Sequence, residues 1–230
     1  MRSIWRTLDR GLARDIALVC LADIIVGVSF GAITVSLGLP FWLPMLLSIV
    51  VFAGAAQFMF VAIVAAGGNP IAGVLAGLLV NARHLPFGFA IGDVLGTGWP
   101  RRIVGSHLMI DESVAFALAQ DETERRRAAY WACGVALFAC WNVGVLAGAF
   151  GGTVVTNTHA FGLDAAFPAV LLALILPAMR DRATRRAALA GVAVALAGAA
   201  FLPAGLPVLM AMAGVVAGLR GVNTTKEATA

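Results

Sequence analysis

Long apolar runs alternate with short polar or basic segments along almost the whole chain. The hydrocarbon core of a bilayer is about 30 Å thick, so a spanning helix needs about 20 mostly apolar residues. The pattern predicts candidate spans at residues 16–37, 40–66, 71–95, 103–119, 128–152, 165–179, 187–202 and 206–219. We therefore predict an all-α fold, a polytopic membrane helix bundle of seven or eight spans, with residues 1–230 in a single transmembrane domain.

The candidate span at residues 103–119 is the most polar of these runs, because it contains His107, Asp111 and Glu112. If this segment spans, the count is eight and the basic clusters fall on one side, except for the pair Arg101 and Arg102. If it does not span, the number of spans is odd, and the basic clusters no longer all fall on one side of the membrane unless another run is re-entrant. The pattern therefore leaves the count open between seven and eight.

Two neighbouring apolar runs are interrupted by polar residues, glycine and proline. The sequence GAAQF at 54–58 interrupts one run, and NARHLPFG at 81–88 interrupts the next. Proline removes a helical hydrogen bond, so Pro86 favours a break in the turn before it. Irregular backbone inside a bilayer persists only where protein or a wet cavity satisfies its polar groups. We therefore predict broken helices near 54–58 and 81–88 that together build one internal polar site.

Polar side chains in these interruptions are the candidate binding residues. Burying an unpaired amide or charge is unfavourable, so polar groups at membrane depth face the bundle interior and often mark a transport pathway. A zwitterion suits such a site, because its carboxylate can meet a helix N-terminus or Arg83 while its ammonium meets freed carbonyls. The candidate substrate-binding residues are Gly54, Gln57, Phe58, Asn81 and Arg83.

Structural roles compete with binding at each of these positions. Gln57 and Asn81 can instead form interhelical hydrogen bonds that only hold the bundle together. Arg83 can snorkel towards the interface, or form an ion pair with Asp93 or Asp111. The sequence does not choose between these roles.

A second set of residues, His84, His107, Asp111 and Glu112, is a candidate proton relay or structural pair. Histidine titrates near physiological pH, which makes His84 a candidate proton carrier, although a packed and hydrogen-bonded histidine fits equally well. His107 and Asp111 are four residues apart, a spacing that places them on one face of a continuous helix. Two ligands do not make a zinc site, so we expect no metal and no cofactor. Asp23 is interpreted as an exposed residue at the membrane interface.

Composition supports a membrane protein and excludes a nucleic-acid-binding one. The chain is 61% hydrophobic and 12% charged, with a mean hydropathy of +0.94, well outside the range of a soluble domain. Its isoelectric point is near 9.6, but its basic residues lie between apolar runs rather than on one solvated face. This arrangement follows the positive-inside rule. We therefore expect a multi-pass protein of the inner (cytoplasmic) membrane, with residues 1–15 and 221–230 both cytoplasmic.

Small residues and a faint internal echo suggest how the helices pack. Gly27 and Gly31, like Gly144 and Gly148, have the four-residue spacing that lets helix backbones approach closely in lipid. The sequence VGVSFGA, followed by WLPMLLSIV, resembles VGVLAGAFGG, followed by AFPAVLLALIL. Transporters are often built from repeats, so an internal duplication is possible on this pattern.

Aromatic anchors and enzyme motifs add little to the functional picture. The tryptophans, together with Tyr130, mostly lie near predicted span ends, where amphipathic rings anchor at the interface; they are Trp5, Trp42, Trp99, Trp131 and Trp141. We assign them no chemistry. The chain has no nucleophile elbow, no P-loop and no HExxH motif, so we do not expect an enzyme.

An ordered series of motifs resembles the AzlC family of branched-chain amino acid permeases, which includes the YgaZ-type members. The series is GVSFGAITVSLGLP, FAGAAQFMFVAIVAAGGNP, LLVNARHLPFG and LMIDESVAFAL. The resemblance covers most of the chain before Arg180. It places the family's shared polar motifs on residues 54–58, on Asn81, Arg83 and His84, and on Asp111 and Glu112. It implies the large subunit of an exporter with a separate, small AzlD/YgaH-type membrane partner.

The leading hypothesis is a secondary transporter that exports branched-chain and similar apolar amino acids by alternating access, driven by the proton gradient. The side-chain pocket is expected from Phe52, Phe58, Phe60 and Phe87. The alternative is a non-transporting structural subunit whose polar residues bind and scaffold a partner protein.

Overall fold

The computed structural model describes residues 9–154, 172, 176, 178–202, 206–211 and 214. Across these residues the chain is helical and contains no strand. It divides into two compact units, one formed by Met1–Gln57 with Val80–Leu163 and the other by Phe58–Leu79 with Asp164–Ala230. The interruptions between helices at residues 51–53 and 82–83 both lie in the first unit.

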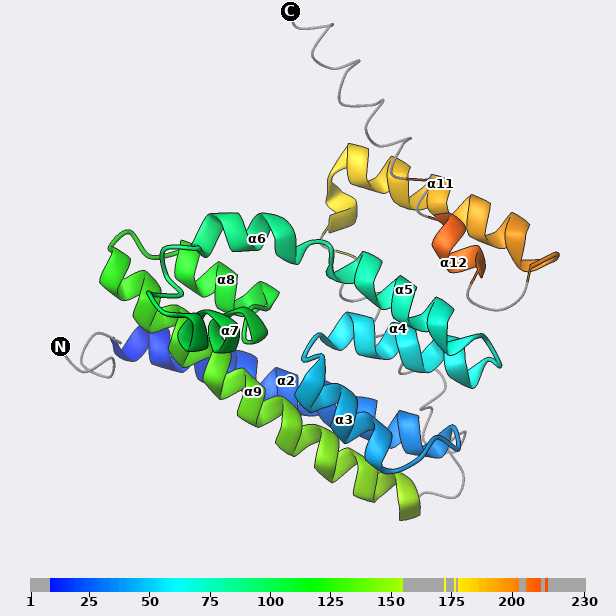
Figure 1. Cartoon of the computed structure of the whole chain (residues 1–230), viewed down its shortest axis with the longest axis horizontal. Coiled ribbons are helices and arrows are strands. Elements are labelled where there is room, and N and C mark those ends of the chain that lie inside the picture. The colour runs from blue at the N-terminus through cyan, green and yellow to red at the C-terminus, as the bar shows by residue number, and fades with distance from the viewer. Residues whose placement is uncertain are drawn as a thin grey trace, which may run out of the picture. The chain divides into compact units, whose positions relative to one another are not determined.

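Along the described chain, a series of shorter helices lies between the two long helices α2 and α9 (Figure 1). The helices are α2 (Arg10–Ser36), α3 (Trp42–Val50), α4 (Gly54–Ala65), α5 (Pro70–Asn81), α6 (His84–Ile91), α7 (Trp99–His107), α8 (Asp111–Leu118), α9 (Thr123–Val154), α11 (Arg182–Ala199) and α12 (Leu206–Met210), with a 3-10 helix, η2, at Ala178–Arg180. The predicted all-α fold is confirmed.

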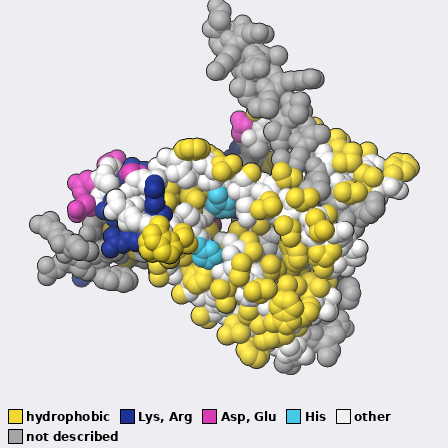
Figure 2. Space-filling view, in the orientation of Figure 1, with side chains coloured by type: hydrophobic (Ala, Val, Ile, Leu, Met, Phe, Trp, Pro, Cys, Tyr) yellow, Lys and Arg dark blue, Asp and Glu magenta, His cyan; other side chains and the backbone are white. Residues whose placement is uncertain are grey.

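Helical segments long and apolar enough to cross a membrane occur in the described part of the chain at Arg10–Ser36, at Pro70–Ile91, which combines α5 and α6, and at Thr123–Thr153. Large hydrophobic side chains are exposed along them, including Ile25 and Val143, and hydrophobic side chains cover much of the visible face in Figure 2. Lipid is the solvent that such a surface requires, so the predicted membrane helix bundle is confirmed. The candidate span at 165–179 and much of that at 206–219 lie outside the described residues, and the count of seven or eight spans stays a prediction.

Proline positions explain where several of the short helices begin. Pro44, Pro70, Pro86 and Pro100 all lie within the first three residues of their helices, α3, α5, α6 and α7. The first backbone N–H groups of a helix have no intrahelical acceptor, so proline loses nothing there. Each proline therefore lies where a new helix begins, and none of them interrupts the backbone hydrogen bonds in the interior of its helix.

The segment at 103–119, for which the sequence left a membrane span open, contains two short helices. α7 has 9 residues and α8 has 8, which at 1.5 Å per residue gives lengths of about 12–14 Å. Neither length covers a hydrocarbon core of about 30 Å. The break at residues 108–110 is stabilised by Ser113, whose Oγ accepts from Ile110 N at 3.1 Å and donates to Leu108 O at 3.0 Å.

The two predicted breaks are confirmed, with the first shifted by a few residues. α3 and α4 are separated at residues 51–53, and GAAQF forms the first turn of α4 rather than the break itself. Phe52 has a φ of 42°, a left-handed conformation that is strained for a bulky residue. α5 and α6 are separated at residues 82–83, one turn before Pro86 as the sequence predicts.

The long helices α2 and α9 run parallel and in close contact (Figure 1). A Cβ on Gly27 would lie 2.9 Å from Trp141 O, and a Cβ on Gly31 would collide with Val145 O. In the same way, side chains at Gly144 and Gly148 would collide with backbone atoms of Ile24 and Val28. The predicted use of the glycine pairs in helix packing is therefore confirmed, and the two echo segments pack on each other.

The parallel arrangement brings two basic segments together at one end. Arg125 Nη2 lies 2.5 Å from Asp9 Oδ2, which ties the start of α9 to the start of α2. Arg10 and Arg14 on α2 and Arg125 to Arg127 on α9 are therefore near the same end of these helices. This agrees with the sequence pattern, which places both basic segments on one side of the membrane.

Candidate functional site

Gln57 is the most unusual polar residue in the described part of the chain. It lies in the first turn of α4, where its backbone N–H donates to Ala53 O at 3.0 Å. Its side chain is only 1% exposed, and neither Nε2 nor Oε1 has a hydrogen-bond partner among the described residues. A buried amide left without partners destabilises a protein by about 1–3 kcal/mol, so this side chain has hydrogen-bonding capacity that the described residues do not satisfy.

The start of α4 is also rich in backbone donors. The N–H of Gln57 donates to Ala53 O in the first backbone hydrogen bond of α4. The N–H groups of Gly54, Ala55 and Ala56 come before that bond, so they have no acceptor within the helix. Such a helix end carries a partial positive charge and attracts anions. The side chain of Gln57 and the N-terminus of α4 therefore form one buried polar region.

Trp141 of α9 lies against this same turn. A Cβ on Gly54 would lie only 3.2 Å from Trp141 Cη2, so a glycine is needed for this close approach. The indole stacks on Phe30 of α2 with ring centroids 5.9 Å apart. It is 3% exposed, and its Nε1 is buried with no partner within the described ranges.

The sequence interpretation of Trp141 as an interfacial anchor is wrong. The residue lies in the middle of the apolar run at 128–152 and is buried between α2 and α4, not at a span end. The missed signal was its distance from both ends of that run. A tryptophan at such a depth needs a partner for its N–H.

Asn81, the last residue of α5, is half-buried and carries another unpaired amide oxygen. Its Oδ1 is buried without a partner in the described chain. α4 and α5 are antiparallel, with Gly73 packed on Phe60. Gln57 at the start of α4 and Asn81 at the end of α5 thus each carry a buried polar atom without a partner in the described chain.

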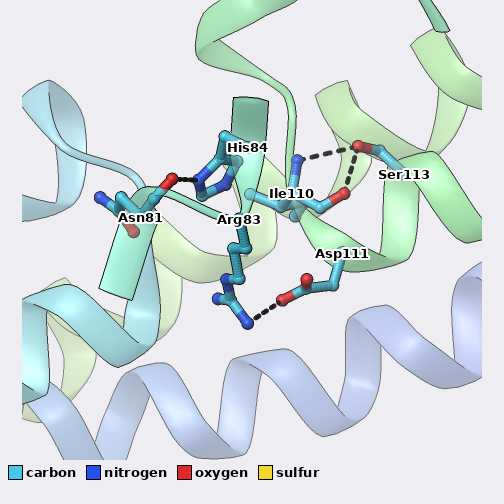
Figure 3. Close-up of polar contacts among 6 residues, drawn as sticks. All are labelled: Asn81, Arg83, His84, Ile110, Asp111 and Ser113. Atoms are coloured by element: carbon cyan, nitrogen blue, oxygen red, sulfur yellow. Dashed lines mark hydrogen bonds and ion pairs between the residues drawn. The ribbon is translucent and has the colours of Figure 1, made fainter. Parts of the chain in front are cut away.

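His84 is held by packing and a hydrogen bond. Its Nδ1 lies 2.8 Å from Asn81 O, across the α5–α6 break (Figure 3). Its ring meets Phe87 edge-on, with centroids 5.9 Å apart. These contacts match the structural alternative that the sequence left open, and they fix the carbonyl end of α5.

Arg83 and Asp111 form an ion pair, with Nη1 and Oδ2 2.7 Å apart (Figure 3). The two side chains are 40% and 42% exposed. Asp93, the other partner considered, pairs with Arg126 at 3.3 Å. Arg83 is therefore already neutralised, and its contact joins the α5–α6 break to the start of α8.

His107 and Asp111 do not share a helix face, so that prediction is wrong. His107 ends α7 and Asp111 begins α8, because the chain breaks between them. The His107 ring packs on Phe52 at 6.1 Å and on Phe138 at 5.7 Å. It thereby supports the strained residue that precedes α4.

Asp23 is more enclosed than an interfacial residue, and this corrects the sequence interpretation. Its Oδ2 is buried and has no hydrogen-bond partner in the described chain. Asp23 is therefore half-buried on α2 rather than exposed at the membrane interface.

The phenylalanines expected to form one apolar pocket lie in different clusters. Phe52 packs on His107 and Phe138, Phe60 packs on Gly73, and Phe87 packs against the core around Ile91. Phe58, next to Gln57, is fully buried.

Sequence reasoning also missed a polar contact between α3 and α9. Ser48 Oγ donates to Asn142 Oδ1 at 2.7 Å, and Asn142 Nδ2 donates to Phe138 O at 2.8 Å. Asn142 follows Trp141, so this pair fixes the part of α9 that faces the first turn of α4. The signal available in the sequence was a lone asparagine in the middle of an apolar run.

Comparison with known proteins gives matches over this same region. The family model described as AzlC protein matches residues 18–155, which include both helix breaks. The chain is 26% identical over 202 residues to the branched-chain amino acid transport protein AzlC of Bacillus subtilis (strain 168), covering 85% of this chain and 78% of that protein. It is 30% identical over 195 residues to an uncharacterized membrane protein of Archaeoglobus fulgidus, covering 81% and 82%. No solved structure matches the chain.

Proposed function

This chain belongs to the AzlC family, and on that basis we propose that it is a secondary transporter of branched-chain and similar apolar amino acids. It is a multi-pass membrane protein. The proposal includes export across the cytoplasmic membrane by alternating access, with both termini in the cytoplasm. The name of the Bacillus subtilis relative supports the substrate class.

The observation that carries the proposal is the buried amide of Gln57, unpaired among the described residues, together with the buried and likewise unpaired Oδ1 of Asn81. Unsatisfied polar groups at membrane depth are costly, and in transporters they occur where discontinuous helices bind substrate. The two breaks therefore support a solute site rather than a simple packing contact.

The helix ends give this site the polarity of an amino acid. The N-terminus of α4 is the positive end of a helix dipole, and the C-terminus of α5 is the negative end of another. In our proposal the substrate carboxylate lies at the start of α4, near Gln57, and its ammonium lies at the end of α5, near Asn81. Arg83 serves mainly to hold the break in place through Asp111.

Preference among apolar side chains is expected to be weak. One methylene in a hydrophobic pocket changes binding by only about 1–3 kcal/mol. Leucine, isoleucine, valine and methionine should therefore compete with one another, with Phe58 as the buried aromatic residue closest in sequence to the amides.

Proton coupling completes the proposal. The acidic group that supports it is Asp23, whose Oδ2 is buried in the span formed by α2 and has no hydrogen-bond partner among the described residues. We also propose a small AzlD/YgaH-type membrane subunit as the partner, as the family resemblance implies. The chain is not proposed to be an enzyme.

Efflux of labelled leucine from preloaded cells tests the function. Cells with this chain and its small partner should lose label faster than cells that lack both, and excess unlabelled valine should slow that loss. Equal efflux from both kinds of cell would remove the proposal.

A structural subunit is the second candidate, and the Arg83–Asp111 and Ser48–Asn142 contacts favour it because they join helices without a ligand. On that view, Gln57→Ala abolishes assembly with the partner and leaves every amino-acid flux normal. The transporter proposal expects the reverse, with assembly intact and leucine efflux lost.

A further inference from the structure

Trp141 is the buried polar side chain whose contacts best define a ligand subsite. Its indole is held on one face by Phe30 and on its outer edge by Gly54. The atoms nearest Gly54 are Cη2, Cζ2 and Cζ3 of the six-membered ring. The tip of the six-membered ring therefore makes the contact with Gly54, and Nε1 belongs to the adjoining five-membered ring of the same buried indole.

The polar groups around this turn are mostly donors. An indole nitrogen only donates, and Trp141 Nε1 has no acceptor in the described chain. The amides of Ala55 and Ala56 precede the first bond of the α4 ladder, and Gln57 adds two more donor hydrogens on Nε2. The unpaired acceptors of the proposed site are fewer, namely Gln57 Oε1 on this turn and Asn81 Oδ1 at the end of α5. A group with several lone pairs and negative charge fits this excess of donors.

Three arginines that could compete for that anion are already paired. Arg83, the basic residue that the sequence proposed for a carboxylate, is paired with Asp111. Arg126 is likewise paired with Asp93, and Arg125 with Asp9. The anion-binding capacity of the site is therefore concentrated in neutral donors at a helix end, not in these arginines.

We infer that Trp141, Gln57 and the first turn of α4 form the subsite for the α-carboxylate of the transported amino acid, with Trp141 Nε1–H as a direct donor. The inference rests on the proposed function and adds a residue to which no role had been assigned. The stack on Phe30 orients the indole, and Gly54 lets the helix end approach it. Trp141 is thus a substrate-binding residue as well as a packing one.

The test compares leucine with 3-methylbutylamine, the same molecule without its carboxylate, in binding assays on the purified complete chain with its partner. Trp141→Phe keeps an aromatic ring for Phe30 and removes only the N–H. Leucine binding should weaken about tenfold, the value of one hydrogen bond to a charged group. The binding of 3-methylbutylamine should stay within twofold of the wild-type value.

The matched control is Trp131→Phe, which changes a tryptophan of the same helix that packs on Gly105 instead of Gly54. It should leave both ligands unaffected. Unchanged leucine binding in Trp141→Phe would overturn the subsite while leaving the transporter proposal intact. An equal loss of affinity for both ligands would also overturn it, because a general packing defect weakens the binding of a ligand whether or not it carries a carboxylate. If the wild-type protein binds no leucine, the proposed function itself fails.

A second measurement covers the case in which Trp141→Phe does not fold. A variant with Trp5, Trp42, Trp99 and Trp131 replaced by phenylalanine leaves Trp141 as the sole tryptophan. Leucine should change its emission, and 3-methylbutylamine should not. Emission that ignores leucine, or that responds equally to both ligands, would contradict the inference.

Discussion

Gly27 of α2 lies directly against Gly144 of α9, and a Cβ on Gly27 would come within 3.5 Å of the carbonyl carbon of Gly144. The same added atom would lie 2.9 Å from the carbonyl oxygen of Trp141. The two helices come closest at Gly31 and Gly148, and their close backbone packing extends back to Trp141. Backbone packing between two long helices fixes the indole that borders the first turn of α4.

This packing predicts strong sensitivity to side-chain volume at Gly148. A valine there would meet the backbone of Val28, which cannot move without displacing α2. We expect Gly148→Val to destabilise the protein by at least about 1–3 kcal/mol, the usual cost of overpacking. Gly151→Val is the matched control, because Gly151 lies on the same helix with nothing within 4 Å of its added Cβ. Thermal stability in detergent measures both variants, and equal melting temperatures would contradict the packing.

The Ser48–Asn142 hydrogen bond predicts a measurable coupling between α3 and α9. Ser48→Ala leaves Asn142 Oδ1 without its donor. Side-chain hydrogen bonds between membrane helices average about 0.6 kcal/mol and reach about 1.7 kcal/mol, so we expect a loss in that range. A double-mutant cycle with Asn142→Leu isolates the pair, and strictly additive effects would show that the contact contributes nothing.

The Arg83–Asp111 pair predicts rescue by charge exchange. Arg83→Asp alone places two carboxylates where an ion pair stood, and leucine efflux should fall severalfold. The double variant Arg83→Asp with Asp111→Arg restores opposite charges and should recover most of the efflux. If Arg83 instead binds the substrate carboxylate directly, the exchanged pair stays inactive, and efflux assays on the three proteins separate the two roles.

Asp9 predicts a loss of stability in acid. The backbone amide of Leu12 and the guanidinium of Arg125 hold the pKa of Asp9 below its usual value. A lowered folded-state pKa contributes stability above the unfolded pKa of about 3.9, and that contribution is lost as the pH falls through the folded value. The melting temperature of Asp9→Asn should therefore be lower than that of the wild-type protein at pH 6. This difference in melting temperature should disappear as the pH drops below about 4. A difference that persists in acid would contradict this.

The helix breaks were predictable because their causes are local. Pro86 cannot donate to residue 82, so the break one turn before it follows from the sequence alone. The glycine pairs of α2 and α9 were visible as a spacing, and the structure adds that they face each other in parallel. The break at 108–110 was missed because Ser113 creates it through contacts with backbone atoms, and serine is common in uninterrupted membrane helices.

The candidate site was predictable in part. Gln57 and Asn81 were found because an amide in an apolar run needs a partner, and both lack one among the described residues. The state of Arg83 was not predictable, because the sequence offered two acidic partners and only the fold brings Asp111 to it. Trp141 was missed because tryptophan in a membrane protein is usually interpreted as an interfacial anchor. Its contact with Gly54 joins residues that are far apart in the sequence, so only the fold reveals it.

The central claim is that the unpaired Gln57 amide binds the transported amino acid, and equilibrium binding of labelled leucine to the purified protein tests it most directly. Gln57→Met preserves the length of the side chain and removes its polar atoms, while Gln120→Met makes the same change at a residue that bonds Arg125. We predict leucine binding at least about tenfold weaker in Gln57→Met, the loss expected for a hydrogen bond to a charged group, and unchanged binding in Gln120→Met. Wild-type affinity in a folded Gln57→Met protein would contradict the account.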